Sequence, residues 1–165
     1  MPLTPTAGGQ CSGAGPTVVP NTGLTNDTGN TCTPGTPNAI TNYGGACAVA
    51  LGFPYPGPEH IYQLTLGAGN NPSFSANLAG GTGDLALFLV GSATCGDGVN
   101  CVANSQDAIG PGAGPELIAA ANYPNGNYFL YVDSYYGSPN PASCGAYALT
   151  ITTPLPAELI QFDIS

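Results

Sequence analysis

Three segments of this chain alternate between apolar and polar residues, and a side-chain period of two is typical of a half-buried β-strand. In residues 60–66, Tyr62, Leu64 and Leu66 share one face. Residues 73–78 and 146–152 alternate in the same way. Because a strand that is apolar on one face must bury that face against another layer, these segments predict antiparallel strands around a core.

Two further segments, residues 85–90 and 128–132, are apolar at every position, which predicts central strands that are covered on both faces. Residues 115–121 can form one helical turn after a proline, but we favour a strand there. Clusters of Gly, Pro and Asn separate these segments and predict turns. Many short strands with such turns indicate an all-β fold, an antiparallel β-sandwich. Residues 1–37, rich in Gly, Pro and Thr and without an apolar period, predict an extended N-terminal arm.

Six cysteines constrain the chain further, and none of them has the C-x-x-C spacing of a zinc site. Their even number predicts three disulfides and an oxidising compartment. We expect Cys95 to pair with Cys101, because these two flank a five-residue segment. Cys32 with Cys47 is the second expected pair, and Cys11 with Cys144 follows by elimination.

The charge balance excludes several classes of function. The chain has no Lys or Arg and nine acidic residues, which give a net charge of −9. Nucleic-acid binding depends on cations that displace phosphate counterions, and an anionic membrane surface repels such a chain. No apolar stretch approaches the roughly 20 residues of a membrane helix. Without Lys or Arg the chain has no cleavage site for trypsin-like proteases. This absence reflects either selection in a protease-rich setting or compositional drift.

Four segments resemble the strands of bacterial pre-peptidase C-terminal domains, namely residues 58–66, 83–89, 126–133 and 145–151. The resemblance covers residues 38–152 and implies a small, jelly-roll-like, non-catalytic β-sandwich that accompanies secreted bacterial or archaeal proteins. Some members of this family bind Ca²⁺. Ala86 stands where the family often has a second aspartate in its central strand.

Residues 153–165 follow the last strand of the predicted sandwich. Pro154 and Pro156 predict a stiff spacer, and after it Ile160, Phe162 and Ile164 form the apolar face of an amphipathic strand. An isolated strand cannot bury this face, so it must pair with its own domain, with a further domain or with a neighbouring molecule. Addition to a neighbour would build a filament. The alternatives are an ordinary edge strand, or a linker of the kind that precedes C-terminal sorting regions in some secreted bacterial proteins.

Catalysis is not expected from these residues. His60, the single histidine, begins a strand and is read as a structural residue, and no Gly-x-Ser-x-Gly motif is present. A cysteine nucleophile requires a free thiol, whereas all six cysteines can form disulfides. A glycosidase requires two carboxylates at a fixed separation, and no pair of carboxylates in the sequence stands out. Calcium is the one cofactor that these residues suggest, because it binds carboxylates in flexible loops. Its candidate ligands are Asp84, Asp97, Asp107 and Asp133. The alternative interpretation is that these are ordinary solvated aspartates in turns.

We therefore expect a non-catalytic extracellular subunit of a cell-surface layer or filament, secreted by a bacterium or archaeon. It would associate with itself through its C-terminal strand. Asn26 is the acceptor of the one N-glycosylation sequon, or simply part of an exposed loop. The main alternative is an accessory module of a secreted hydrolase that binds polysaccharide or protein through rings such as Tyr55, Tyr135 and Tyr136. A calcium-dependent adhesion domain is a third possibility.

Overall fold

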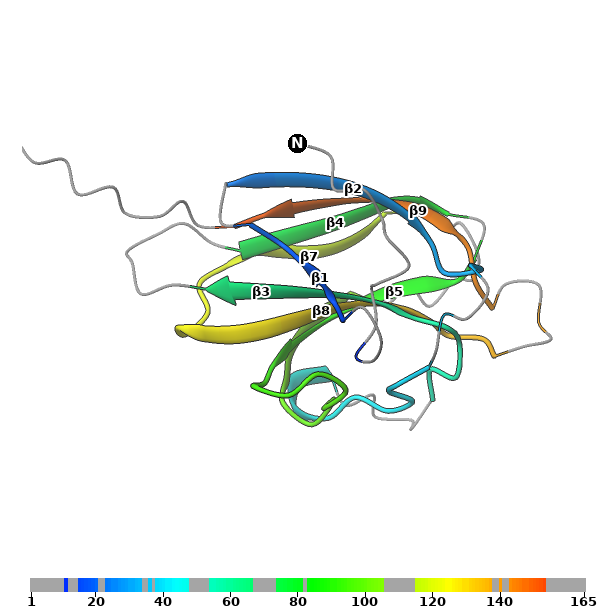
Figure 1. The fold of residues 1–165 in the computed structure, drawn as a ribbon, viewed down its shortest axis with the longest axis horizontal. Helices are drawn as coiled ribbons and strands as arrows, with labels where there is room; N and C mark the ends of the chain where they lie inside the picture. The colour runs from blue at the N-terminus through cyan, green and yellow to red at the C-terminus, as the bar shows by residue number, and fades with distance from the viewer. Residues whose placement is uncertain are drawn as a thin grey trace, which may run out of the picture.

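Nine β-strands and one short 3₁₀ turn form the regular structure of the described residues in the computed structural model (Figure 1). The structure describes residues 11, 15–20, 23–33, 36, 38–47, 54–66, 74–81, 83–105, 115–137, 140 and 143–153. In chain order the elements are β1 (Thr17–Val18), β2 (Leu24–Asn30), η1 (Gly45–Cys47), β3 (His60–Leu66), β4 (Phe74–Gly81), β5 (Leu85–Gly91), β6 (Cys101–Ser105), β7 (Glu116–Ala121), β8 (Gly126–Ser134) and β9 (Ala146–Thr152).

The strands form two packed sheets. Sheet A has the order β1-β3-β8-β5-β6, and sheet B has the order β2-β9-β4-β7. The short strand β1 pairs with β3 in parallel, and the remaining pairs are antiparallel. With β1 set aside, β3-β8-β5-β6 facing β2-β9-β4-β7 is the strand order of a jelly roll, which consists of two Greek keys. The predicted antiparallel β-sandwich is confirmed.

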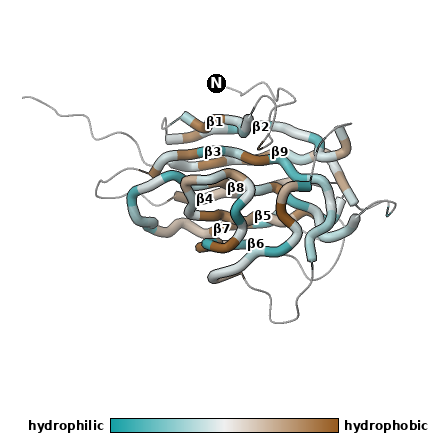
Figure 2. Tube along the Cα trace, turned by 60° about the horizontal axis from the view of Figure 1, so that its bottom comes forward, coloured by the Kyte–Doolittle hydropathy of each residue, from teal (hydrophilic) through white to brown (hydrophobic). Residues whose placement is uncertain are grey.

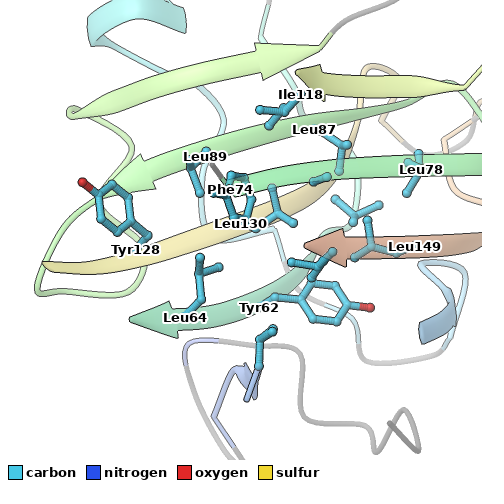
Figure 3. Packing of buried hydrophobic residues seen from close by; sticks show 14 of the residues in the cluster. Tyr62, Leu64, Phe74, Leu78, Leu87, Leu89, Ile118, Tyr128, Leu130 and Leu149 are labelled. Carbon is cyan, nitrogen blue, oxygen red and sulfur yellow. The ribbon is translucent and has the colours of Figure 1, made fainter. Parts of the chain in front are cut away.

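A first core lies between the two sheets and follows the period of two. Tyr62, Leu64 and Leu66 of β3 are buried in it, as are alternate residues of β4 and β9. Figure 3 shows these side chains pointing into the space between the sheets, and in Figure 2 the hydrophobic residues gather along the strands. Because each fully buried Leu or Phe contributes about 1.5–3 kcal/mol, this alternation is the main determinant of the sandwich.

A second core covers the opposite face of sheet A. The central strands β5 and β8 turn Phe88, Phe129 and Tyr131 toward it, which confirms that they are buried on both faces. Its outer wall includes residues 38–47, here called the cover segment, seen in cyan below the lower sheet in Figure 1. The ring of Tyr43 in this segment stacks on that of Phe88, with centroids 3.7 Å apart.

Strand β2 corrects the prediction of an extended arm over residues 1–37. Residues Leu24–Asn30 pair with β9 along its whole length and form an edge of sheet B. The sequence pattern missed this strand because its inward positions hold Thr25, Asp27 and Gly29, while the apolar Leu24 is 57% exposed. Residue 38 is therefore not the start of the sandwich.

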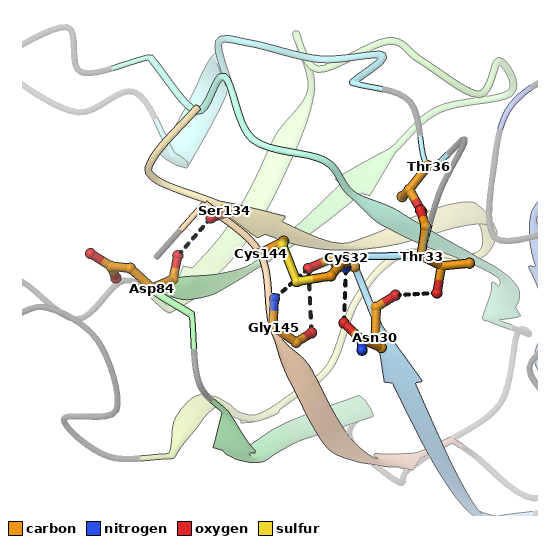
Figure 4. The surroundings of a disulfide bond; sticks show 9 residues. Asn30, Cys32, Thr33, Thr36, Asp84, Ser134, Cys144 and Gly145 are labelled. Atoms are coloured by element: carbon orange, nitrogen blue, oxygen red, sulfur yellow. Dashed lines mark hydrogen bonds between the residues drawn. A yellow bond between two sulfur atoms is a disulfide. The ribbon is translucent and has the colours of Figure 1, made fainter. Parts of the chain in front are cut away.

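All six cysteines form disulfides, as predicted, but the three expected pairings are wrong. The bonds join Cys11 to Cys95, Cys32 to Cys144, and Cys47 to Cys101. Cys32 and Cys144 lie at the ends of the adjacent strands β2 and β9, two residues beyond the pair Asn30 and Ala146 (Figure 4). Cys47 of η1 and Cys101 of β6 meet in the second core. The disulfide partners are thus set by which strands and segments lie together in the fold, and not by closeness in the sequence.

Candidate functional site

Two completely buried carboxyl groups face each other where the second core ends. Glu59 immediately precedes β3, and Asp133 lies near the end of β8. His60 pairs with Val132, so one further step of the antiparallel register places Glu59 opposite Asp133. Both residues are 0% exposed. Like charges opposite each other destabilise a strand pair, so this arrangement requires a compensating proton or cation.

Each carboxyl group accepts hydrogen bonds, several of them from the cover segment. Glu59 Oε1 accepts from the backbone N–H of Ala39 (2.8 Å), and Oε2 accepts a longer bond from Ile40 (3.4 Å). Asp133 Oδ2 accepts from the hydroxyl of Tyr43 (2.6 Å), and Oδ1 accepts from the N–H of Ser134 (2.7 Å). The carboxyl pair therefore fastens the cover segment onto sheet A.

The protonation of this pair departs from that of exposed carboxyls. Burial is the main cause that raises the pKa of Glu59 to about 7, and the two backbone hydrogen bonds oppose it. Burial, followed by the charge of Glu59, raises the pKa of Asp133 well above its ordinary value. Because the chain has no Lys or Arg to neutralise either group, a proton held by the pair supplies the compensation near neutral pH.

Tyrosines surround this end of sheet A. Burial, together with the nearby carboxylates Asp133 and Glu59, raises the pKa of Tyr43, so its hydroxyl stays protonated and donates. Burial also raises the pKa of Tyr55, with the charge of Asp84 as the next cause. The rings of Tyr135 and Tyr136 make an edge contact with centroids 4.9 Å apart, and Tyr135 also contacts Tyr55. Tyr135 and Tyr136 are half-buried.

A second polar cluster crosses between the sheets near β2. His60 Nδ1 lies 2.7 Å from the hydroxyl of Tyr147, which lies 2.7 Å from that of Tyr62. Tyr62 in turn donates to Asp27 Oδ2 (2.8 Å). Since each hydroxyl has one hydrogen, the donation to Asp27 makes Tyr147 donate to Tyr62 and His60 donate from Nδ1.

This chain of hydrogen bonds depends on a glycine in the edge strand. A Cβ at Gly29 would lie 2.3 Å from the ring and hydroxyl of Tyr147, so only glycine leaves room for that side chain. Burial lowers the pKa of His60, against the opposing charge of Asp27. The series His60–Tyr147–Tyr62–Asp27 therefore links strands β3, β9 and β2 across the two sheets.

The candidate calcium ligands are distributed over different parts of the structure. Asp84, just before β5, and Asp133 both lie near Tyr55. Asp97 instead accepts hydrogen bonds from Ser92 and Val99 within its own loop. Asp107 lies outside the described residues. Among the residues that the structure describes, no group of three or more His, Cys, Asp or Glu side chains is placed to hold a metal ion.

The remaining candidates from the sequence lie at the sandwich edge or outside the described residues. Asn26, the sequon asparagine, is exposed on β2, and its side-chain oxygen accepts a hydrogen bond from Thr150 (2.9 Å). Its segment is therefore a strand rather than a loop. Ile160, Phe162 and Ile164 lie outside the described residues. No helix among the described residues is long and apolar enough to cross a membrane.

The sequence pattern indicated Asp133 only as a calcium candidate and did not single out Glu59. A signal for both was present, because Glu59 is in phase with buried Ile61 and Asp133 with buried Tyr131. Comparison of the chain with protein-family models, curated proteins and solved structures found no match in any of the three. The local geometry therefore carries the functional argument.

Proposed function

We propose that this protein is a non-catalytic structural subunit of a bacterial or archaeal cell-surface layer or filament, and that it assembles by β-strand addition. The observation that carries the proposal is the place where the chain leaves the sandwich. The N–H of Thr153, directly after β9, donates to the carbonyl of Gly23 (2.8 Å). Thr153, the residue before this segment, therefore lies beside β2, an edge strand of sheet B.

The sequence of this segment supports a role as a donated strand. Pro154 and Pro156 restrict the residues before them to extended conformations. Ile160, Phe162 and Ile164 then present one apolar face. In β-strand addition the backbone hydrogen bonds supply affinity, and alternate side chains of the added strand supply specificity.

The covalent and chemical character of the sandwich supports an extracellular setting. Three disulfides indicate an oxidising environment, and each joins residues at least 54 positions apart. A chain without Lys or Arg has no trypsin-type cleavage site, even when it unfolds transiently. Such protection favours a subunit that must persist outside the cell.

The test compares the oxidised full chain with a variant that lacks residues 154–165, by negative-stain electron microscopy and analytical ultracentrifugation. We expect filaments or sheets from the full chain and monomers from the truncated variant. Monodisperse particles from both proteins would overturn assembly through this segment.

A second candidate function is an accessory module of a secreted hydrolase, as the resemblance to pre-peptidase C-terminal domains implies. The half-buried Tyr135 and Tyr136, which contact each other next to Tyr55, favour it, because partly exposed aromatic rings can contact sugars. Titration calorimetry with soluble polysaccharides tests this function. Binding that Tyr136→Ala abolishes would support the module, and the absence of heat from every polysaccharide would count against it.

A further inference from the structure

We propose that the open edge of β2 is the surface that accepts residues 159–164 of a second copy of this chain. This inference rests on the proposed function and names the partner surface for its assembly. Among the described strands, β1 and β6 end sheet A and β2 and β7 end sheet B, which gives four candidate edges.

The hydrogen bonds of β2 show which backbone groups face outward. Thr153 donates to Gly23, and Thr31 donates to Gly145, so the odd-numbered residues of this stretch bond to β9. In an antiparallel pair the residues between them direct their N–H and C=O groups to the other side. Leu24, Asn26 and Thr28 therefore direct these groups toward the open edge. In the described part of the chain, β2 has a strand neighbour on one side only.

Part of this edge is already occupied by local contacts. The N–H of Thr28 donates to Asp27 Oδ1, and the carbonyl of Asn30 accepts from Thr33. The outward groups of Leu24 and Asn26 and the carbonyl of Thr28 lie in the regular part of the strand. These groups match a short incoming strand whose length is close to that of residues 159–164.

The three other edges are less suited to a regular added strand. Strand β1 has two residues. Strand β6 shifts register against β5, and β7 shifts register against β4, which locally disrupts the ladder. The outward N–H of Leu117 in β7 also donates to the hydroxyl of Ser105 (2.9 Å). Only β2 among these edges pairs with its neighbour in an unbroken register along seven residues.

The surface beside β2 also suits an apolar strand. Tyr62 of β3 donates to Asp27 of β2, so β1, β3 and β2 lie at the same side of the sandwich. Sheet A extends past β3 by β1, whereas sheet B has no described strand outside β2. An added strand would complete sheet B and extend the apolar core with Ile160, Phe162 and Ile164.

A second copy is favoured over the same chain as the donor. Thr153 and Leu155 each precede a proline, and a residue in that position favours an extended conformation over a turn. At about 3 Å per residue, an extended spacer over residues 153–156 would span roughly 10 Å. A spacer of that reach favours delivery of residues 159–164 to the β2 edge of a second copy over a return to their own β2.

Three full-length variants test the acceptor edge. Asn26→Pro removes one outward N–H and none of the bonds to β9, because edge strands tolerate proline at such positions. Asn26→Thr is the matched control, since it keeps the N–H and removes the same carboxamide and sequon. Phe162→Asp disables the donor strand. Sedimentation velocity measures assembly, and thermal melting confirms that each variant is folded.

We expect Asn26→Thr to assemble like the wild type, and both Asn26→Pro and Phe162→Asp to sediment as monomers. Mixing these two monomeric variants should give dimers and nothing larger, because one supplies an intact donor and the other an intact acceptor. If Asn26→Pro assembles like the wild type while Phe162→Asp does not, the acceptor is another edge and this inference is wrong. If Phe162→Asp assembles normally, the proposed function itself is wrong. If Asn26→Pro unfolds, Asn26→Lys provides the same test by placing a charge on the edge.

Discussion

Replacing Glu59 with glutamine should remove the part of the pH dependence of folding stability that the Glu59 carboxyl contributes. The Glu59 carboxyl is buried opposite Asp133, and burial raises its pKa from 4.5 to about 7. A glutamine is neutral at every pH, and its side-chain oxygen can keep the bond from the N–H of Ala39. The substitution therefore removes the proton uptake of Glu59 and the effect of its charge on Asp133, while it preserves the attachment of the cover segment.

The sign follows from the direction of the shift. The folded-state pKa lies above the unfolded value, so the folded protein holds a proton that the unfolded chain has already released. The stability that this proton contributes is fully present below about pH 4.5 and is lost as the pH rises through about 7. At about 1.4 kcal/mol per pKa unit, the wild type should lose roughly 3 kcal/mol across this window. The raised pKa of Asp133 acts in the same direction.

Urea denaturation followed by tyrosine fluorescence, with the disulfides intact, measures this difference at about pH 5 and about pH 8. We expect Glu59→Gln to match the wild type within about 1 kcal/mol at the lower pH and to exceed it by about 2–3 kcal/mol at the higher pH. Asp97→Asn makes the same change in net charge in a separate loop, so it serves as the charge-matched control. A wild-type stability that rises from pH 5 to pH 8 would refute the reasoning. So would a Glu59→Gln variant that is less stable than the wild type by the same amount at both pH values.

Three further perturbations probe other contacts. Tyr43→Phe leaves Asp133 Oδ2 without its hydroxyl donor and should lower the free energy of unfolding by about 1–3 kcal/mol in urea; an unchanged value would show that this bond contributes nothing. Gly29→Ala should displace the ring of Tyr147 and destabilise the fold by about 1–3 kcal/mol, and ¹⁵N NMR of the His60 ring should report the loss of its Nδ1 hydrogen bond. The double variant Cys32→Ala/Cys144→Ala opens a loop of 112 residues and should lose about 4–5 kcal/mol, while peptide mapping of the wild type by mass spectrometry should recover the Cys32–Cys144 link.

The strands that the sequence predicted correctly are those whose burial follows from side-chain pattern alone. Strands β3 and β9 alternate cleanly, and β5 and β8 are apolar on both faces because a core covers each side. Strand β2 could not be found this way. Its inward Thr25 and Asp27 are buried because Tyr62 and the sheet surround them, and nothing in the local sequence carries that information.

The site was less predictable than the fold because it depends on register. Glu59 and Asp133 are 74 positions apart in sequence, and only the pairing of β3 with β8 brings them together. The disulfide partners depend on the fold in the same manner, since Cys32 meets Cys144 through the pairing of β2 with β9. The short loop between Cys95 and Cys101 favoured a local bond, but the two cysteines have partners in different parts of the structure.

The disulfide pattern also dictates the order in which native bonds can form during oxidative folding. The three cysteines nearest the N-terminus, Cys11, Cys32 and Cys47, are all partners of the three that follow. When the chain emerges from its N-terminal side, no native bond can form until Cys95 has appeared, and the last waits for Cys144. Any bond among the first three cysteines is non-native and has to be exchanged through a mixed disulfide. Any such bond that forms during oxidative folding therefore has to be corrected by thiol–disulfide reshuffling, and refolding without a disulfide isomerase should accumulate misbridged chains if early bonds form.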